Sequence, residues 1–182
     1  GAKSQKRRAG QTAMYHVLSA LVRMFAPILV HTTEEAWEAM KVKPEACDSV
    51  HLAHMPKVDP TIDYASEEPK WQKLMALRNE VLRVLEGLRR DKIIASNQEA
   101  SVTMHCTPED AAAVKAFGIP QFAALCIVSE VKLEEGAAQT TVAAGKSAHP
   151  KCQRCWNYWP SVGASPEHPD ICDRCASVVG RP

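Results

Sequence analysis

The N-terminal part of the chain has apolar residues at helical spacing. From Met14 to Phe25 they recur at i, i+3, i+4, i+7, i+8 and i+11, which predicts one amphipathic helix. A proline interrupts this stripe, and Thr32 is then followed three residues later by Glu35. Because this spacing is that of a capping box, it predicts a second helix from Thr32 to about Met40.

A third and longer helix is predicted between Ser66 and Lys92. Pro69 suits its first turn, and the apolar residues from Trp71 to Leu88 keep helical spacing. We expect the three helices to bury one another's stripes as an antiparallel bundle. A bundle of only three helices leaves apolar surface exposed on one side. We therefore also expect a preceding helix that this sequence does not contain.

The next part of the chain changes to the pattern of strands. Residues 100–106 alternate between apolar and polar, which predicts a half-buried strand. Thr107 and the proline after it then begin a helix that Gly118 ends. A further strand is expected near residues 131–133, with residues 139–144 as its partner across a short turn.

The predicted fold is therefore mainly α with a small α/β module. We expect a helical bundle in residues 1–95, a small mixed α/β subdomain in residues 96–146 and a cysteine-bearing segment in residues 147–182. A length of 182 residues is enough for one domain of ordinary size and a second, small one. The hydrophobic content of 46% is usual for a globular protein. No apolar run approaches the roughly 20 residues that cross a bilayer, so no membrane span is expected.

Charge is distributed unevenly along the sequence. Residues 34–68 contain nine acidic and three basic side chains, whereas residues 71–92 contain three acidic and six basic ones. A polyanion would prefer the second region, together with the basic arm of residues 1–10. Ordinary solvated helix faces explain the same distribution equally well.

The chain contains seven cysteines, and an odd number does not fit a disulfide framework. Four of them form two Cys-x-x-Cys pairs with sixteen residues between the pairs, which is the spacing of a zinc ribbon. Two such pairs can surround one Zn²⁺ as a tetrahedron, with each sulfur about 2.3 Å from the ion. The predicted ligands of one structural zinc ion are Cys152, Cys155, Cys172 and Cys175.

Other interpretations of this motif stay open. A redox or disulfide role usually involves one Cys-x-x-Cys at a helix start, and two matched pairs argue against it. Four thiolates leave no open position for water, which argues against catalytic zinc. His149 and His168 are possible substitutes for a cysteine ligand, although we expect them to be bystanders.

Basic and aromatic residues surround the predicted zinc site. Four thiolates leave it with a net negative charge, and Arg154 and Arg174 either balance that charge or point outward to phosphate. Trp156 is expected to pack on the site in preference to stacking on bases. For Tyr158 and Trp159, packing and stacking are equally compatible with the sequence.

No complete active site is visible in the sequence. It has no phosphate-binding loop, dinucleotide-binding glycine pattern, nucleophile elbow or His-Glu-x-x-His helix. We therefore expect this chain to bind a partner and not to catalyse a reaction.

Three segments resemble one family. Residues 21–37 resemble the anticodon-binding helical domain of class I aminoacyl-tRNA synthetases for branched aliphatic amino acids. Residues 71–100 are similar to the next block of the isoleucyl-tRNA synthetases, although Ala95 and Gln98 stand where that family usually has glycine and leucine. Residues 151–175 are similar to the C-terminal zinc finger of the bacterial-type isoleucyl enzymes, and this match is the most specific of the three.

The resemblance implies a C-terminal fragment of such a synthetase, made of an anticodon-binding bundle and a four-cysteine zinc finger. The whole enzyme would join isoleucine to its tRNA, using ATP that binds only in the missing catalytic core. For this chain the implied cofactor is one structural Zn²⁺. The implied partners are the cognate isoleucine tRNA, through its anticodon arm, and the remainder of a monomeric, cytoplasmic synthetase without membrane contact. The residues expected to bind RNA are Arg78, Arg83, Arg89, Arg90, Lys92, Arg154, Trp156 and Arg174.

Two other functions stay open. Related zinc fingers close some formamidopyrimidine-DNA glycosylases, where an arginine of the finger loop meets DNA, but residues 156–171 contain no arginine here. A free-standing factor that binds tRNA or a protein would have the same sequence features. Whether the natural reading frame extends upstream of Gly1 separates that factor from a synthetase fragment.

Overall fold

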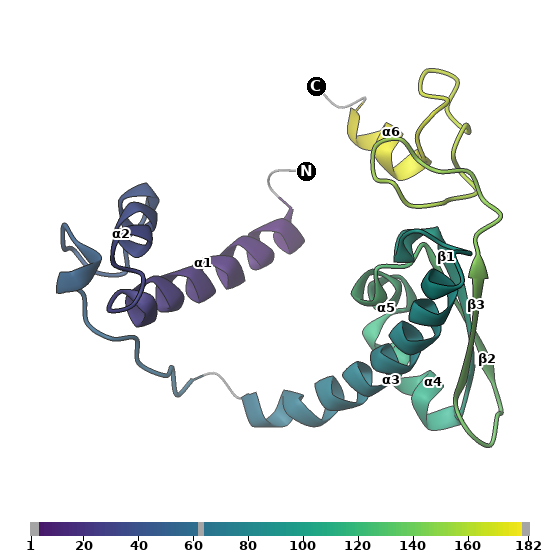
Figure 1. Ribbon diagram of the computed structural model, residues 1–182, viewed down its shortest axis with the longest axis horizontal. Helices are drawn as coiled ribbons and strands as arrows, with labels where there is room; N and C mark the ends of the chain where they lie inside the picture. The colour runs from purple at the N-terminus through teal and green to yellow at the C-terminus, as the bar shows by residue number, and fades with distance from the viewer. Residues whose placement is uncertain (1–3, 62–63, 180–182) are drawn as a thin grey trace. The chain divides into compact units, whose positions relative to one another are not determined.

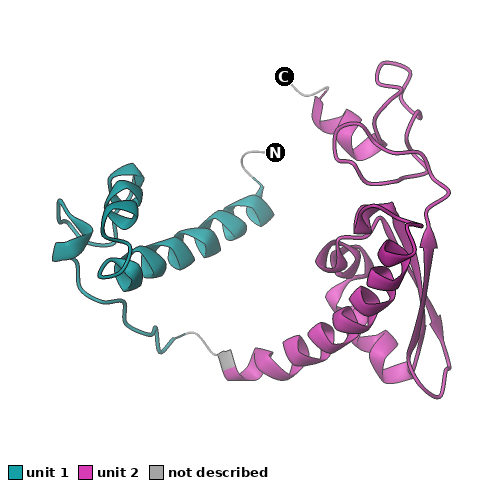
Figure 2. Cartoon of the chain, in the orientation of Figure 1, with its two compact units in different colours: residues 1–62 teal, residues 63–182 magenta. Residues whose placement is uncertain are grey.

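A computed structural model of the chain describes residues 4–61 and 64–179, in the arrangement of Figure 1. They belong to two compact units, residues 1–62 and residues 63–182 (Figure 2). The first three residues of the predicted basic arm and the last three of the cysteine-bearing segment lie outside the described residues. The predicted fold class, mainly α with a small α/β module and a C-terminal cysteine cluster, is confirmed. The division into residues 1–95, 96–146 and 147–182 stays a prediction.

The first unit contains two helices and a short 3₁₀ turn. They are α1 (Gln5–Phe25), α2 (Val30–Ala39) and η1 (Val50–Leu52). The expected cap at Thr32 is wrong, because α2 already begins at Val30. The Leu29 carbonyl accepts hydrogen bonds from both the backbone N–H and the hydroxyl of Thr33, so the helical turn is closed before Thr32 can act as a cap.

The core of the first unit is built around Trp37. Val22, Ala26 and Val50 surround its fully buried indole, whose Nε1 donates to the Cys47 carbonyl at 3.2 Å. So few buried side chains make a small core for a unit of this length.

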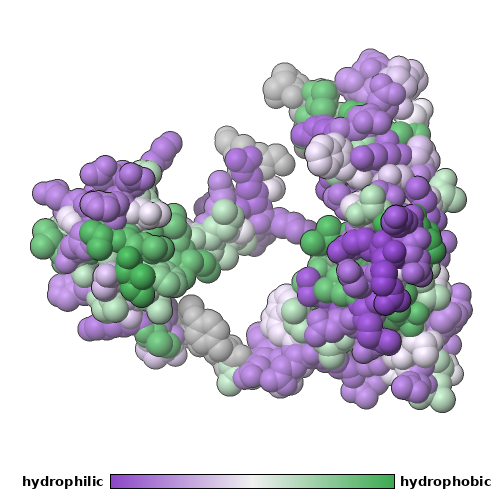
Figure 3. All heavy atoms as spheres, viewed as in Figure 1, coloured by the Kyte–Doolittle hydropathy of each residue, from purple (hydrophilic) through white to green (hydrophobic). Residues whose placement is uncertain are grey.

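Most of the predicted stripe on α1 lies outside this core. Met14 is 73% exposed and Leu21 is 44% exposed, and Figure 3 shows hydrophobic residues gathered on the visible face of the unit. We call this surface the α1 stripe. Its members are Met14, Val17, Leu18, Leu21, Phe25 and Ile28.

The second unit combines helices with a three-stranded sheet. Its elements are α3 (Tyr64–Arg90), η2 (Asn97–Glu99), β1 (Ala100–Cys106), α4 (Pro108–Phe117), α5 (Ile119–Cys126), β2 (Glu130–Glu135), β3 (Thr141–Lys146) and α6 (Asp173–Val179). The strand predicted over residues 100–106 is confirmed, with alternate residues buried. The helix between Thr107 and Gly118 is confirmed as well. The Thr107 hydroxyl accepts from the Asp110 N–H at 3.2 Å, and Gly118 has a φ of 102° that suits glycine.

The strand order is β2-β1-β3, with β1 parallel to β2 and antiparallel to β3. The prediction that residues 139–144 pair with residues 131–133 is therefore wrong, since both strands pair with β1. The connection between them passes the end of β1, where the Ala137 N–H donates to the Cys106 carbonyl at 3.2 Å. The most apolar strand thus takes the centre, where both of its edges are hydrogen-bonded.

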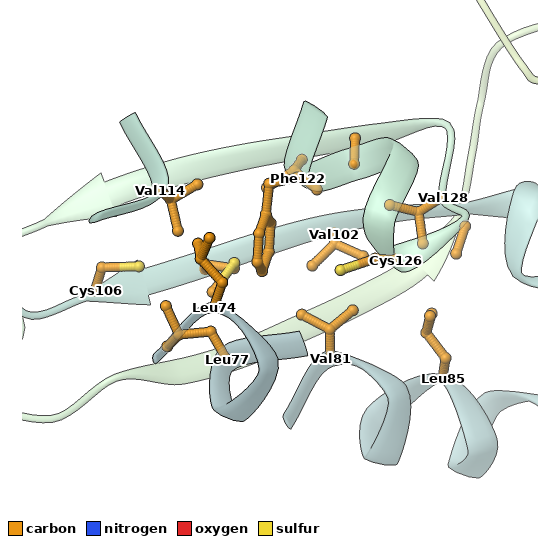
Figure 4. Close-up of a cluster of buried hydrophobic side chains, with 14 of the residues drawn as sticks. Leu74, Leu77, Val81, Leu85, Val102, Cys106, Val114, Phe122, Cys126 and Val128 are labelled. Atoms are coloured by element: carbon orange, nitrogen blue, oxygen red, sulfur yellow. The ribbon is translucent and has the colours of Figure 1, made fainter. Parts of the chain in front are cut away.

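Helix α3 packs on the sheet of its own unit. Its residues Leu74, Val81 and Leu85 are fully buried and belong to one cluster with Val102 and Phe122 (Figure 4). The predicted bundle joined this helix to the two helices of the first unit, but its apolar stripe is covered by the sheet and by α4 and α5. Among the described residues, no helix has the length and apolar character that a bilayer crossing requires.

A polar network joins α3, α4 and the segment before β3. Asp110 accepts a hydrogen bond from the Thr140 hydroxyl at 2.5 Å and lies 3.2 Å from Lys73 Nζ. Burial raises the pKa of the Asp110 carboxyl, but these partners outweigh burial and hold that pKa below its ordinary value. Because the folded-state pKa is the lower one, the network stabilises the fold above about pH 4, and this stabilisation is lost as the pH falls through the folded-state pKa.

The substitution Asp110→Asn is therefore expected to destabilise the second unit by about 1–3 kcal/mol at pH 7 and by less at pH 3. Urea unfolding at the two pH values measures this difference. Asp91→Asn, an exposed change in the same unit, serves as the control. An equal loss at both pH values would contradict the assigned role of the carboxylate.

Candidate metal centre and RNA-binding surface

The four cysteines of the predicted zinc site come together in the structure. Their sulfur atoms all lie within 4.8 Å of one another. Cys152, Cys172 and Cys175 are buried, and Cys155 is partly exposed. Among the described residues they form a cluster without His149 or His168, which agrees with the expectation that these histidines are bystanders.

Two tight turns place the sulfurs. In the first, the Trp156 N–H donates to the Cys152 carbonyl at 2.8 Å, and Trp156 takes a positive φ of 65°. In the second, Cys172 precedes α6, and its N–H donates to the Cys152 Sγ at 3.3 Å. The Cys155 and Cys172 sulfurs are 3.9 Å apart, close to the roughly 3.8 Å edge of a tetrahedron with 2.3 Å zinc–sulfur bonds. The donor set therefore fits one tetrahedral Zn²⁺.

The protein environment acts differently on individual thiols. Burial raises the pKa of Cys152, but the backbone N–H groups of Cys155, Cys172 and Arg154 outweigh burial and lower that pKa to about 6. Burial raises the pKa of Cys172 to about 12. Arg154 Nη1 lies 3.6 Å from the Cys175 sulfur, so its charge faces the cluster. Zn²⁺ binds thiolates, so metal binding at this cluster would displace the thiol protons that the four cysteines still carry.

Arg174 is also close to the sulfurs. Burial lowers the pKa of its guanidinium, but the Cys175 and Cys155 sulfurs outweigh burial and raise it. Both arginines of the finger therefore act on the charge of the cluster, in line with the charge-balancing interpretation of the sequence.

The three aromatic residues of the finger differ in exposure. Trp156 is 60% exposed, so the expectation that it packs on the site is wrong, and Lys151 Nζ lies 5.4 Å from its ring centroid. Trp159 packs against the cysteines, and its buried Nε1 has no hydrogen-bond partner within the described part of the chain. Tyr158 is half-buried, and its backbone N–H donates to the Ser129 hydroxyl at 2.7 Å. An indole that remains exposed beside a lysine offers a stacking face.

The basic residues predicted on α3 do not form one patch. Arg78 is held in the fold, because its Nε donates to the Leu125 carbonyl at 3.0 Å. Arg83 pairs with Glu80 at 2.6 Å and lines a groove beside β3.

The other basic residues lie at the C-terminal end of the helix. Arg89 bonds to Glu86 and to Asn97, whereas the side chain of Arg90 is 81% exposed. Lys92 follows with a left-handed φ of 59°. Arg90 and Lys92 at this end are exposed, whereas Arg78 is held in the fold.

The residues that join the finger to the sheet were missed in the sequence. Ser129 is 1% exposed and bonds to both Tyr158 and the Gln98 carbonyl, and Asn97 bonds to Arg89. A lone serine after an apolar segment carries no signal of such a role, since its partners are distant in sequence.

Two known families match this chain. Residues 1–104 match the family described as "Anticodon-binding domain of tRNA ligase". Residues 150–178 match the family described as "Zinc finger found in FPG and IleRS". The second match contains all four clustered cysteines.

Individual relatives match nearly the whole chain. The isoleucine–tRNA ligase of Symbiobacterium thermophilum is 37% identical over 191 residues, and that of Carboxydothermus hydrogenoformans is 38% identical over 185 residues. The isoleucine–tRNA ligase of Bacillus cereus strain G9842 is 36% identical over 189 residues. Each match covers 97% or 98% of this chain and 20% of the relative. The chain thus spans about a fifth of the length of the curated relatives it matches.

Proposed function

Because this chain belongs to the family of anticodon-binding domains of tRNA ligases, we propose that it is the tRNA-binding, C-terminal part of an isoleucine–tRNA ligase. It recognises the anticodon arm of the isoleucine tRNA. The observation that carries this proposal is the presence, in one chain, of an anticodon-binding match and a zinc-finger match with a complete set of four thiols.

The other candidates fit fewer observations. A DNA glycosylase accounts for the zinc finger, whose family description names FPG, but leaves the match over residues 1–104 without a role. A free-standing tRNA-binding factor accounts for both matches, and an upstream reading frame would separate it from a ligase.

The remaining four fifths of such a ligase supply the chemistry. We assign to that part the binding of ATP and the joining of isoleucine to tRNA, in a monomeric enzyme of the cytoplasm. The present chain contributes the metal-ordered finger and the basic end of α3.

The α1 stripe supports contact with the remainder of the ligase. Met14, Leu18 and Val42 line an open groove of about 460 Å³ on the first unit. The same groove is bordered by Lys41 and by Gln11. Exposed apolar side chains that gather around a groove are common at interfaces. An apolar helix elsewhere in the ligase, with acidic residues beside its apolar face, would suit this groove.

A titration of the zinc-loaded chain with tRNA tests the proposal. We expect tighter binding to isoleucine tRNA than to the same tRNA with an altered anticodon. The logarithm of the affinity should fall linearly with the logarithm of salt concentration, by roughly 0.7–0.9 for each phosphate contacted. Equal affinity for an unrelated tRNA would contradict the proposal, and a preference for damaged duplex DNA would favour the glycosylase.

Arg90→Gln is expected to weaken tRNA binding about fivefold and to reduce the salt slope by about one, because Arg90 is the most exposed arginine at the end of α3. Lys132→Gln removes an exposed charge from β2 and serves as the matched control. The role of Arg90 is refuted when both variants bind tRNA with the same affinity and slope.

A further inference from the structure

Two groups of candidate RNA contacts lie at the same end of the second unit. The first is the helix-end patch, which consists of Arg89 and Arg90 in the last turn of α3 and of Lys92 just after it. The second is the finger patch, which consists of Lys151, Arg154 and Trp156. Figure 1 shows the C-terminal end of α3 and the cysteine-bearing finger on the same side of the sheet, beside the start of β1.

A continuous chain of hydrogen bonds connects the two patches. Arg89 Nη2 donates to Asn97 Oδ1 at 2.7 Å, which ties the helix-end patch to η2. The next residue, Gln98, offers its carbonyl to the Ser129 hydroxyl at 2.6 Å. The same hydroxyl accepts from the Tyr158 N–H at 2.7 Å, two residues after Trp156. One hydroxyl group therefore joins the turn after α3 to the finger.

The position of Ser129 is itself fixed. Its side chain is almost completely buried, and its backbone N–H donates to the Ala100 carbonyl at 3.2 Å at the start of the sheet. Buried hydrogen bonds of this kind are costly to break, because neither partner finds water as a substitute. A second hydrogen bond links the same two parts of the chain, since the Ser147 N–H donates to the Glu99 carbonyl at 2.7 Å. The finger is thus attached to the module at defined points.

We propose that Ser129 is a positioning residue that holds the helix-end patch and the finger patch as one RNA-binding surface. This inference rests on the proposed function, since it assumes that both patches meet the same tRNA. Ser129 does not touch the RNA. It fixes the spacing of the two patches, so that phosphates and an unstacked base of one RNA segment meet both at once.

The test uses the full, zinc-loaded chain with Ser129→Ala. We expect bound zinc to remain, hydrogen exchange of the Tyr158 amide to accelerate, and tRNA affinity to fall about tenfold. The salt slope should fall by about two, because the contacts of one patch are lost. Ser129→Thr keeps the hydroxyl and should restore both affinity and slope. Ser101→Ala is the matched control, because Ser101 also donates from a hydroxyl within the module, to Glu130 at 2.8 Å, but does not reach the finger.

Several results would overturn the inference. One is a Ser129→Ala chain that binds tRNA with the affinity and salt slope of the wild type although its Tyr158 amide exchanges rapidly. Should that variant fail to fold, Arg90→Gln and Lys151→Gln are compared in the otherwise unchanged chain. Each removes one charge from one of the two patches, so each must lower the salt slope of binding to the same tRNA. A slope that responds to only one of them refutes the shared surface. Absence of tRNA binding by the unchanged chain would instead refute the proposed function.

Discussion

Replacing Cys172 by serine is expected to abolish stoichiometric zinc binding and to disorder the finger of residues 150–178. The buried cluster in this segment consists of Cys152, Cys172 and Cys175, with only partly buried side chains around them. No apolar core remains once the metal is lost, so metal binding supplies most of the folding free energy of the segment. For structural zinc in small domains that contribution is about 10 kcal/mol or more.

Metal analysis and hydrogen exchange measure this result. The wild-type chain should carry one zinc ion, and the variant none, while the sheet and α3 keep their protection. Cys47→Ser is the matched control, because Cys47 lies in the first unit outside the cluster and should leave the zinc content unchanged. A Cys172→Ser chain that kept one tightly bound zinc ion and an ordered finger would refute the four-thiol site.

Truncation of Phe122 to alanine is expected to destabilise the second unit by about 3–5 kcal/mol. Its ring is fully buried between α3 and the sheet, with Val114, Val102 and Leu74 around it (Figure 4). Removal of the ring leaves a cavity that these rigidly placed neighbours cannot fill. The midpoint of thermal or denaturant unfolding should fall accordingly.

Phe25→Ala provides a matched change in the first unit. Phe25 is 42% exposed, so its truncation should alter stability much less. Comparable losses in the two variants would contradict the placement of Phe122 in the core of the second unit.

Local sequence patterns predicted the parts of the fold that depend on neighbouring residues. The alternation in β1 and the signals at Thr107 and Gly118 identify their elements correctly, because each rests on geometry within a few residues. The two Cys-x-x-Cys pairs were equally informative, since the turn that brings Cys152 and Cys155 together is local.

Features that depend on distant contacts were not predictable in the same way. The short connection before β3 has the length of a hairpin loop, and only the tertiary structure shows that β1 lies between the strands it joins. The apolar stripe of α3 fits a helical partner and a sheet equally well. In the sequence, Arg78 and Arg83 look available to bind RNA. Only the folded chain shows that Arg78 bonds to Leu125 and Arg83 to Glu80.

The three-strand sheet has one further consequence. Within the described sheet, β2 and β3 each pair on one side only, and an open strand edge is where copies of a protein can join and grow into fibrils. The β2 sequence Glu-Val-Lys-Leu-Glu-Glu places Glu130, Lys132 and Glu134 along that edge. Addition of the same strand from another molecule would place like charges opposite one another on neighbouring strands, which is unfavourable. The composition of this outer strand thus protects a small, open sheet from self-assembly.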